Sequence, residues 1–327
     1  MATHINVAKK KQRIIINKLS ISNQKTLLVI AGPTAVGKTA HAIEVARHFK
    51  TVILSADSRQ CYKELNIGVA RPSVQELNEV PHYFIASHSI HDDINAAWYE
   101  AYALNLLKQL FNEHDLIVVT GGTGLYIKAL VEGLDVIPAV DDKIRQHVID
   151  NYNANGLNWL QQQLQFHDPL FSAEGEMQNP QRMMRALEVA LASGQSILTF
   201  RKKPKDPRAF NILQVGLELP RPILNERINA RVEMMMRSGL ESEARQLLPH
   251  RHLNALQTVG YKEIFEYLDS NVTLNEAEEQ IKQNTRRYAK RQMTWFKRQP
   301  NMHWINLQEE KEITPHILSL RNYGQIT

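Results

Sequence analysis

One short stretch decides the fold: residues 27–39 read LLVIA from Leu27 to Ala31 and GPTAVGKT from Gly32 to Thr39. The first part is an apolar run, which is typical of a strand buried in a parallel sheet. The second part matches G-x-x-x-x-G-K-[ST] in full. The apolar strand before it and the helical pattern after it, from Thr39 to Phe49, are the context that this motif requires. We therefore predict a phosphate-binding loop between a strand and a helix.

The chemistry of this loop comes from its backbone and from its last two side chains. Its glycines let backbone N–H groups close around phosphate oxygens at a helix N-terminus, where the helix dipole favours negative charge. Lys38 adds a positive charge, and the Thr39 hydroxyl is a predicted ligand for Mg²⁺. The predicted diphosphate-binding residues are Gly32, Pro33, Thr34, Ala35, Val36, Gly37, Lys38 and Thr39. The motif indicates a di- or triphosphate without identifying it as ATP.

Three further apolar runs predict strands, at Val52–Asp57, Leu116–Thr120 and Ile212–Leu217. Helical stretches separate them, so we predict an α/β fold: a parallel sheet flanked by helices, like that of P-loop NTPases. The strand pattern stops between Gly133 and about Pro207, which indicates a helical insertion domain. The predicted organisation is a basic N-terminal arm (1–25), a catalytic core (26–133 and 207–327) and a helical insertion (134–206). Within the core, helices are expected at Arg221–Leu248 and Leu274–Phe296.

Composition narrows the class of protein. The 327 residues are 43% hydrophobic, enough for a full core, and the single cysteine, Cys61, excludes a disulfide framework and a Cys-rich zinc site. No apolar run approaches the ~20 residues of a membrane span, so we expect a soluble, cytoplasmic protein without membrane contact. The net charge is +5; no acidic residue precedes Glu44, and none lies between Lys282 and Arg298. These basic stretches are either nucleic-acid contacts or solvated faces, and composition leaves both open.

The nearest carboxylate to the phosphate loop is predicted to be Asp57, at the end of the second strand. The chain has no Asn-Lys-x-Asp motif for reading guanine, and the strand at Leu116 runs into Thr120-Gly121-Gly122 instead of an acidic residue. In open α/β sheets, ligands bind outside the carboxyl ends of the strands. Asp57 is therefore a candidate general base. Its alternative roles are a helix N-cap and an outer ligand of Mg²⁺.

At this point the motifs together resemble the tRNA dimethylallyltransferase family. The resemblance covers about residues 26 to 298, and the order of the motifs makes it specific. After the phosphate loop the matching segments are Asp57-Ser58-Arg59-Gln60, Ile67-Gly68, Ala70-Arg71-Pro72, Pro81-His82, Gly121–Tyr126, Gln181-Arg182, Arg185–Glu188, Arg227-Ile228 with Arg231, Gly239-Leu240, Gly260–Glu263 and Lys290-Arg291-Gln292 with Thr294-Trp295.

This resemblance implies transfer of a dimethylallyl group from dimethylallyl diphosphate to the N6 amine of the adenosine 3′-adjacent to the tRNA anticodon. Lys38, Thr39, Mg²⁺ and the family arginine Arg231 would stabilise the departing diphosphate, and Asp57 would take the amine proton. The residues implied to contact tRNA are Asp57, Ser58, Arg59, Gln60, Thr123, Arg145, Gln181, Arg182, Met183, Met184, Arg185, Gly260, Tyr261, Lys262, Lys290, Arg291 and Gln292. We expect the protein to be a monomer. We also expect the aromatic side chains of Tyr288 and Trp295, on the last long helix, to lie in the core.

Two departures from the family pattern keep other functions open. Asn66 and Val69 stand where the family usually has Asp and Thr, which removes a carboxylate and a hydroxyl near the expected pocket. A non-catalytic RNA-binding paralogue is therefore one alternative. A P-loop small-molecule kinase is another, although it leaves the insertion and the basic C-terminal helix unexplained. Transfer to a free adenine nucleotide is a third, and it has no use for the RNA-facing groups.

Overall fold

The computed structural model describes residues 25–201, 207–310 and 312–323, and the chain divides into two compact units. One unit comprises the chain up to Val131 together with Arg208 onward, and the other is Glu132–Pro207. Apart from Lys25, which pairs with Asp115 at 2.7 Å, the predicted basic arm lies outside the described residues.

The first unit is built on a six-stranded sheet in the order β3-β2-β4-β1-β5-β6, and each neighbouring pair of strands is parallel. The predicted α/β fold with a parallel sheet is confirmed. Two short strands were not predicted, because one has two residues and the other, MHWIN, has neither a long apolar run nor strict alternation. The strands are β1 (Thr26–Ala31), β2 (Ile53–Ser55), β3 (His82–Tyr83), β4 (Leu116–Gly121), β5 (Asn211–Glu218) and β6 (Met302–Asn306).

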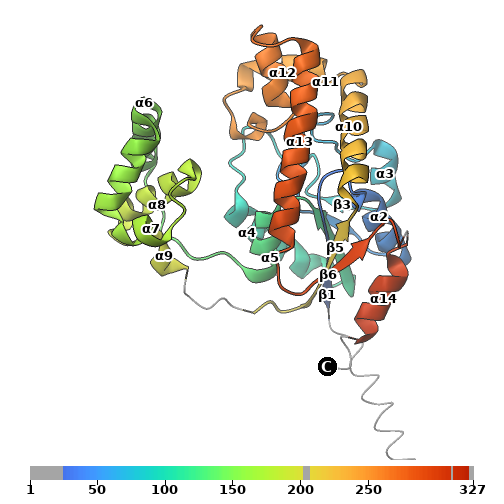
Figure 1. The fold of residues 1–327 in the computed structure, drawn as a ribbon. Coiled ribbons are helices and arrows are strands. Elements are labelled where there is room, and N and C mark those ends of the chain that lie inside the picture. The colour runs from blue at the N-terminus through green and yellow to red at the C-terminus, as the bar shows by residue number, and fades with distance from the viewer. Residues whose placement is uncertain (1–24, 202–206, 311, 324–327) are drawn as a thin grey trace, which may run out of the picture. The chain divides into compact units, whose positions relative to one another are not determined.

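Helices flank this sheet, and α10 and α13 lie side by side (Figure 1). The expected helix Arg221–Leu248 is divided, since Gly239 adopts φ 99° and the chain turns there. The expected helix Leu274–Phe296 is confirmed at both ends; a capping box between Thr273 and Glu276 begins it. The helices are α2 (Lys38–His48), α3 (Val74–Glu79), α4 (Ala96–Leu110), α5 (Gly124–Glu132), α10 (Arg221–Arg237), α11 (Leu240–Leu247), α12 (Tyr261–Leu268), α13 (Leu274–Phe296) and α14 (Thr314–Tyr323), with 3₁₀ turns at Leu248–His250 and Asn254–Leu256.

The core of this unit holds the start of the phosphate loop in place. Leu28 and Ile30 of β1 are fully buried in one cluster with Ala42 and Ile43 of α2 and Ile228 of α10. Burial of a large aliphatic side chain stabilises a fold by about 1.5–3 kcal/mol. The strand before the loop, the helix after it and α10 share this core. Both ends of the phosphate loop are therefore held in place by the packing.

The second unit is helical and has its own core. It comprises α6 (Asp142–His167), α7 (Pro169–Glu174), α8 (Pro180–Ser193) and α9 (Ile197–Phe200). Helix α6 is kinked at Gly156, whose φ of 73° and ψ of −165° are not helical. Val148, Leu160, Phe171 and Leu187 are buried together at the centre. No helix in the described parts of either unit is long and apolar enough to cross a membrane.

Candidate active site

The phosphate loop follows β1 directly, and two of its glycines are required by geometry. Gly32 has φ 153°, and a Cβ there would lie 2.7 Å from the carbonyl oxygen of Leu217. Gly37 has φ 110° and is the N-cap residue of α2. Only glycine adopts such backbone angles without strain. The loop therefore turns tightly and presents the N-terminus of α2 to whatever binds in it.

Lys38 folds back over the loop. Its Nζ donates hydrogen bonds to the carbonyl oxygens of Gly32, at 3.0 Å, and Pro33, at 2.8 Å. Burial lowers the pKa of Lys38 to about 7; the negative charge of Asp57 opposes this shift, and the positive charge of Arg231 adds to it. The ammonium form is therefore poorly stabilised by the protein alone, and an anion in the loop would stabilise it.

Two arginines of α10 reach the same loop. Arg231 donates to the Thr34 hydroxyl at 3.4 Å, and Arg227 donates to the carbonyl oxygen of Val36 at 3.2 Å. Burial lowers the pKa of Arg231. Within the described residues, neither Lys38 nor Arg231 has a carboxylate at ion-pair distance, although both are half-buried. Arg227 was not among the predicted site residues; its i, i+4 spacing from Arg231 was the available signal.

Asp57 lies just beyond the carboxyl end of β2, as predicted. Its Oδ1 accepts hydrogen bonds from the backbone N–H groups of Arg59, at 2.9 Å, and Gln60, at 3.2 Å. Thr123 joins this turn to the end of β4, since its Oγ1 accepts from Ser58 N at 3.0 Å and donates to Ser58 Oγ at 3.2 Å. One oxygen of Asp57 therefore caps a turn, and not the helix N-terminus that was its alternative role.

Asp57 opens into a cavity of about 570 Å³, within the size range of small-molecule sites. Tyr288 lines this cavity and is 37% exposed, so its expected place in the core is wrong. Burial of much of its ring raises the pKa of Tyr288 to about 12, and the Arg291 guanidinium lies 5.7 Å from the ring centroid. The remaining lining residues are Ser58, Arg59, Gln257, Thr258, Val259, Lys262, Glu263, Glu266, Gln280 and Asn284.

Gln292, the next residue after Arg291, does not face RNA. It is 6% exposed; its Oε1 accepts from the backbone N–H of Thr34 and its Nε2 donates to the carbonyl oxygen of Gly122, each at 2.8 Å. The prediction that its side chain contacts tRNA is therefore corrected, because both ends of the amide are bonded inside the protein.

Tyr261 is likewise a structural residue and not an RNA contact. It is fully buried, and its hydroxyl donates to Glu243 at 2.6 Å. Glu243 also accepts from the backbone N–H groups of Ile67, at 2.8 Å, and Gly68, at 2.9 Å. A Cβ at Gly68 would lie 2.6 Å from the Tyr261 ring, so there is no room for a side chain at this position. Gly260, with φ 102°, begins the helix of Tyr261.

Residues 66–70 form a loop that uses two more polar side chains. Gln60 donates to the carbonyl oxygens of Val69 and Ala70, at 3.2 and 3.0 Å, so one end of its amide holds this loop. Asn66 accepts from Arg71 at 3.0 Å. Neither Asn66 nor Val69 lines the cavity, so the two departures from the family pattern lie outside its wall.

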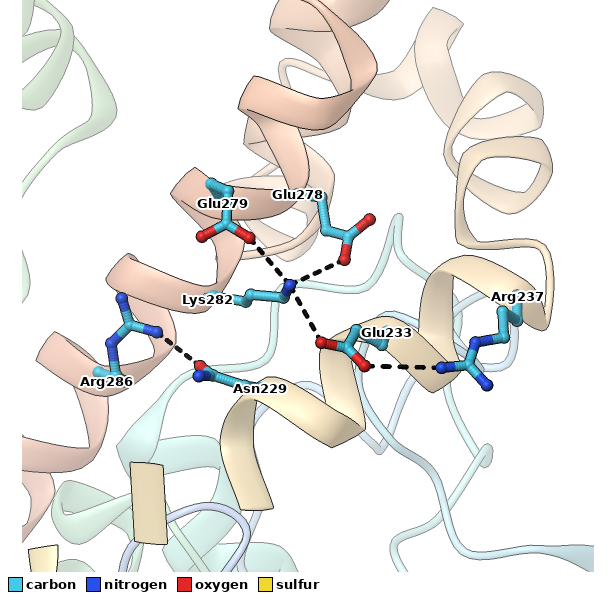
Figure 2. A network of polar contacts seen from close by, with 7 residues as sticks. All are labelled: Asn229, Glu233, Arg237, Glu278, Glu279, Lys282 and Arg286. Carbon is cyan, nitrogen blue, oxygen red and sulfur yellow. Dashed lines mark hydrogen bonds and ion pairs between the residues drawn. The ribbon is translucent and has the colours of Figure 1, made fainter. Parts of the chain in front are cut away.

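The basic stretch of α13 separates into paired and unpaired side chains. Figure 2 shows Lys282 between Glu278 and Glu279 of its own helix, at 3.0 and 2.9 Å, and Glu233 of α10, at 3.2 Å. The contact with Glu233 clamps α10 to α13. Arg286 donates to Asn229 beside it (Figure 2), and Lys297 pairs with Glu218 at 2.6 Å. Lys290 and Arg291 are exposed and have no ion pair with a described residue.

In the helical unit, α8 presents some of its predicted RNA-contacting residues and buries others. Gln181 and Arg182 are exposed, and Arg182 pairs with Glu176. The buried carboxylate of Glu188 lies 3.1 Å from Arg185 and 3.9 Å from Arg145. Met183 and Met184 are 0% and 7% exposed. Their side chains are core residues, and their predicted contact with tRNA is corrected.

A parallel sheet with a P-loop sequence after its first strand and a cavity beyond the carboxyl end of a neighbouring strand defines an α/β protein of the P-loop type. Residues 60–299 match the family model described as IPP transferase. The chain is 44% identical over 293 residues to a tRNA dimethylallyltransferase 1 of Bacteroides fragilis, covering 90% of this chain and 97% of that protein. A tRNA dimethylallyltransferase of Christiangramia forsetii is 45% identical over 297 residues, with 90% and 98% covered.

A solved structure agrees with these relatives. The full-length tRNA isopentenylpyrophosphate transferase of Bacillus halodurans is 33% identical, with a TM-score of 0.67, and the match covers 90% of this chain and 96% of that one. The chain belongs to the IPP transferase family.

Proposed function

We propose that this protein is a cytoplasmic enzyme that transfers a dimethylallyl group from dimethylallyl diphosphate to tRNA. The acceptor is the N6 amine of the adenosine 3′-adjacent to the anticodon, and the products are N6-(dimethylallyl)adenosine and diphosphate. The observation that carries this proposal is a pair of half-buried cations at the phosphate loop, Lys38 and Arg231, which have no ion pair with a described residue. The relatives bear the same activity in their names, and none of those named above is a kinase.

The phosphate loop holds the donor and stabilises its leaving group. The N6 nitrogen attacks the first carbon of the dimethylallyl group, the bond from that carbon to oxygen breaks, and the electron pair stays on the diphosphate. Lys38, Arg231 and the N–H groups at the start of α2 would stabilise the oxygens that gain this charge. Because these groups are held in place before the reaction, they need little reorganisation when the bond breaks.

Asp57 takes the proton that the amine loses. An adenine amine is a poor nucleophile while it keeps both hydrogens, so a base within reach of the cavity is required. Oδ1 is engaged by the turn at Arg59 and Gln60, which leaves Oδ2 as the proton acceptor. The turn thus orients the carboxylate toward the acceptor base.

Mg²⁺ fits the donor set of this site. Within the described residues, no group of three or more His, Cys, Asp or Glu side chains could hold a metal ion alone. Mg²⁺ commonly takes only one or two protein ligands and completes its six oxygens with phosphate and water. The Thr39 hydroxyl, in the first turn of α2, would hold it. When bound, the ion supplies positive charge to the diphosphate.

The RNA side requires a base that has left its stack. An anticodon-loop adenine is reached only after it is flipped into a pocket, where polar and stacking groups read it. The cavity offers Arg59, Lys262 and Tyr288 for this purpose, and Lys290 and Arg291 are exposed cations for backbone phosphates. In the helical unit, Gln181 and Arg182 are the exposed polar groups for a second contact with the tRNA.

The test is a reaction of the purified protein with unmodified tRNA, dimethylallyl diphosphate and Mg²⁺, without ATP. Mass spectrometry of the digested tRNA should show N6-(dimethylallyl)adenosine, in one-to-one ratio with released diphosphate. An absolute need for ATP, or γ-phosphate transfer to a small molecule, would establish the kinase. Binding of tRNA without product would establish the non-catalytic paralogue, and alkylation of free AMP in place of tRNA would establish the third alternative.

A further inference from the structure

Gln292 has no role in the chemistry above, yet both ends of its buried amide are bonded to the loops that form the site. Oε1 accepts from Thr34 N in the phosphate loop, and Nε2 donates to Gly122 O in the loop after β4. A buried polar group that loses its partner destabilises the fold, so these two hydrogen bonds join α13 to both loops.

The contact with Thr34 controls more than one atom, because a peptide group is a rigid plane. The N–H of Thr34 and the carbonyl of Pro33 belong to the same peptide group, and in a trans peptide they point in opposite directions. Gln292 holds the N–H end, and Lys38 Nζ donates to the carbonyl end at 2.8 Å. The orientation of this plane therefore sets where the Lys38 ammonium rests, next to the place that the diphosphate occupies.

The helix that carries Gln292 also carries the proposed RNA contacts. Lys290 and Arg291 precede it directly and are exposed. The helix is fixed to its surroundings on both sides of this point, by the Lys282 clamp to α10 (Figure 2) and by Trp295, which fills the space over Gly124. Between these two anchors, a displacement of α13 at Lys290 and Arg291 would reach the Pro33–Thr34 peptide plane through the Gln292 amide.

We propose that Gln292 is a positioning residue that couples acceptor binding to the diphosphate loop. This inference rests on the proposed function, because it needs tRNA on α13 and a diphosphate in the loop. Coupling between two sites is reciprocal: if tRNA changes the affinity for diphosphate by a given factor, diphosphate changes the affinity for tRNA by the same factor.

The experiment measures that factor directly. The Kd of inorganic diphosphate with Mg²⁺, which fills the loop without reacting, is determined by calorimetry with and without saturating unmodified tRNA. In the wild type we expect tRNA to tighten diphosphate binding by a factor in the usual range of coupling, about 5- to 150-fold. Gln292→Leu removes both hydrogen bonds at similar volume and should bring the factor close to one, with the Kd of tRNA alone unchanged. Its KM for dimethylallyl diphosphate should rise with it.

Two further variants keep the test decisive. Gln299→Leu is the matched control. Among the described residues the Gln299 side chain donates to Trp295 O alone, at 3.3 Å, so this variant should keep the wild-type factor. If Gln292→Leu does not fold, Gln292→Asn takes its place. Asparagine keeps the amide but is one methylene too short to reach both partners, so tRNA should no longer change the Kd of diphosphate in this variant either. A wild-type factor of one, or a folded Gln292 variant with the wild-type factor, overturns the inference. If the wild type makes no modified tRNA at all, the proposed function fails instead.

Discussion

Asp57→Asn separates the base from the turn that holds it. Asparagine keeps the side-chain oxygen that accepts from the Arg59 and Gln60 N–H groups, at 2.9 and 3.2 Å, so the turn should remain. It replaces the other oxygen with an amide that cannot accept a proton. General base catalysis contributes about 10²–10⁴ in rate, roughly 3–5 kcal/mol of barrier. We expect kcat to fall by that factor while the melting temperature changes little.

The assay must separate this loss from an effect on Lys38. The negative charge of Asp57 raises the pKa of Lys38, which burial has lowered to about 7. Without that charge the pKa of Lys38 falls further, so a larger fraction of Lys38 is neutral at any pH near 7. The anionic donor then binds less tightly, and this deficit grows as the pH rises from 6 to 8. Measurement of kcat with saturating donor at pH 6 therefore isolates the base.

The control for this experiment is Asp57→Ala, which removes both the base and the turn acceptor. It should match Asp57→Asn in kcat and unfold more easily, by about 0.5–1.5 kcal/mol for each of the two missing hydrogen bonds. The base assignment is wrong if folded Asp57→Asn turns over within a few-fold of the wild type. In that case the carboxylate only builds the turn, and water or the departing diphosphate removes the proton.

Three other side-chain changes have measurable consequences. Thr39→Ala should raise both the KM for the donor and the Mg²⁺ concentration needed for half-maximal rate, since it removes the proposed metal ligand; steady-state kinetics over a Mg²⁺ series will show it. Changing Lys290 and Arg291 together to Gln should reduce the slope of log K for tRNA against log salt by roughly 0.7–0.9 for each phosphate that the variant no longer neutralises, measured by filter binding. Tyr261→Phe should destabilise the fold by about 1.5–3 kcal/mol in urea unfolding, because it removes a buried hydrogen bond to the Glu243 carboxylate.

The salt-slope experiment and the Tyr261→Phe experiment each have a matched control. Lys297→Gln removes a cation that is already paired with Glu218, so the salt slope for tRNA should stay at its wild-type value. Tyr267→Phe changes the same residue type on the same helix, α12, without a hydrogen bond to Glu243, and its unfolding free energy should be close to wild type. A Tyr261→Phe variant as stable as Tyr267→Phe would contradict the role given to Glu243.

Local signals accounted for much of the fold and for the phosphate half of the site. The apolar run before Gly32 and the loop motif together predicted a strand, a turn and a helix, because each depends on neighbours within a few residues. The start of α13 at Leu274 was readable for the same reason, since Thr273 and Glu276 cap it from three residues apart. The β6 strand was missed because its five residues carry only one fully buried side chain, Ile305.

The α/β class, the phosphate loop and the place of Asp57 after a strand could all be read from the chain alone, since they follow from short-range periodicity and from the rule that parallel strands end at one edge. The roles of Tyr288 and Gln292 could be read only from the folded chain. They lie four residues apart on one face of α13, so periodicity treats them alike. What each residue on that face contacts is decided by parts of the chain that are far away in sequence. Gln292, for example, contacts Thr34, which is more than 250 residues away. Long-range contact is absent from any local pattern, which is why the one residue opens into the cavity and the other is buried between two loops.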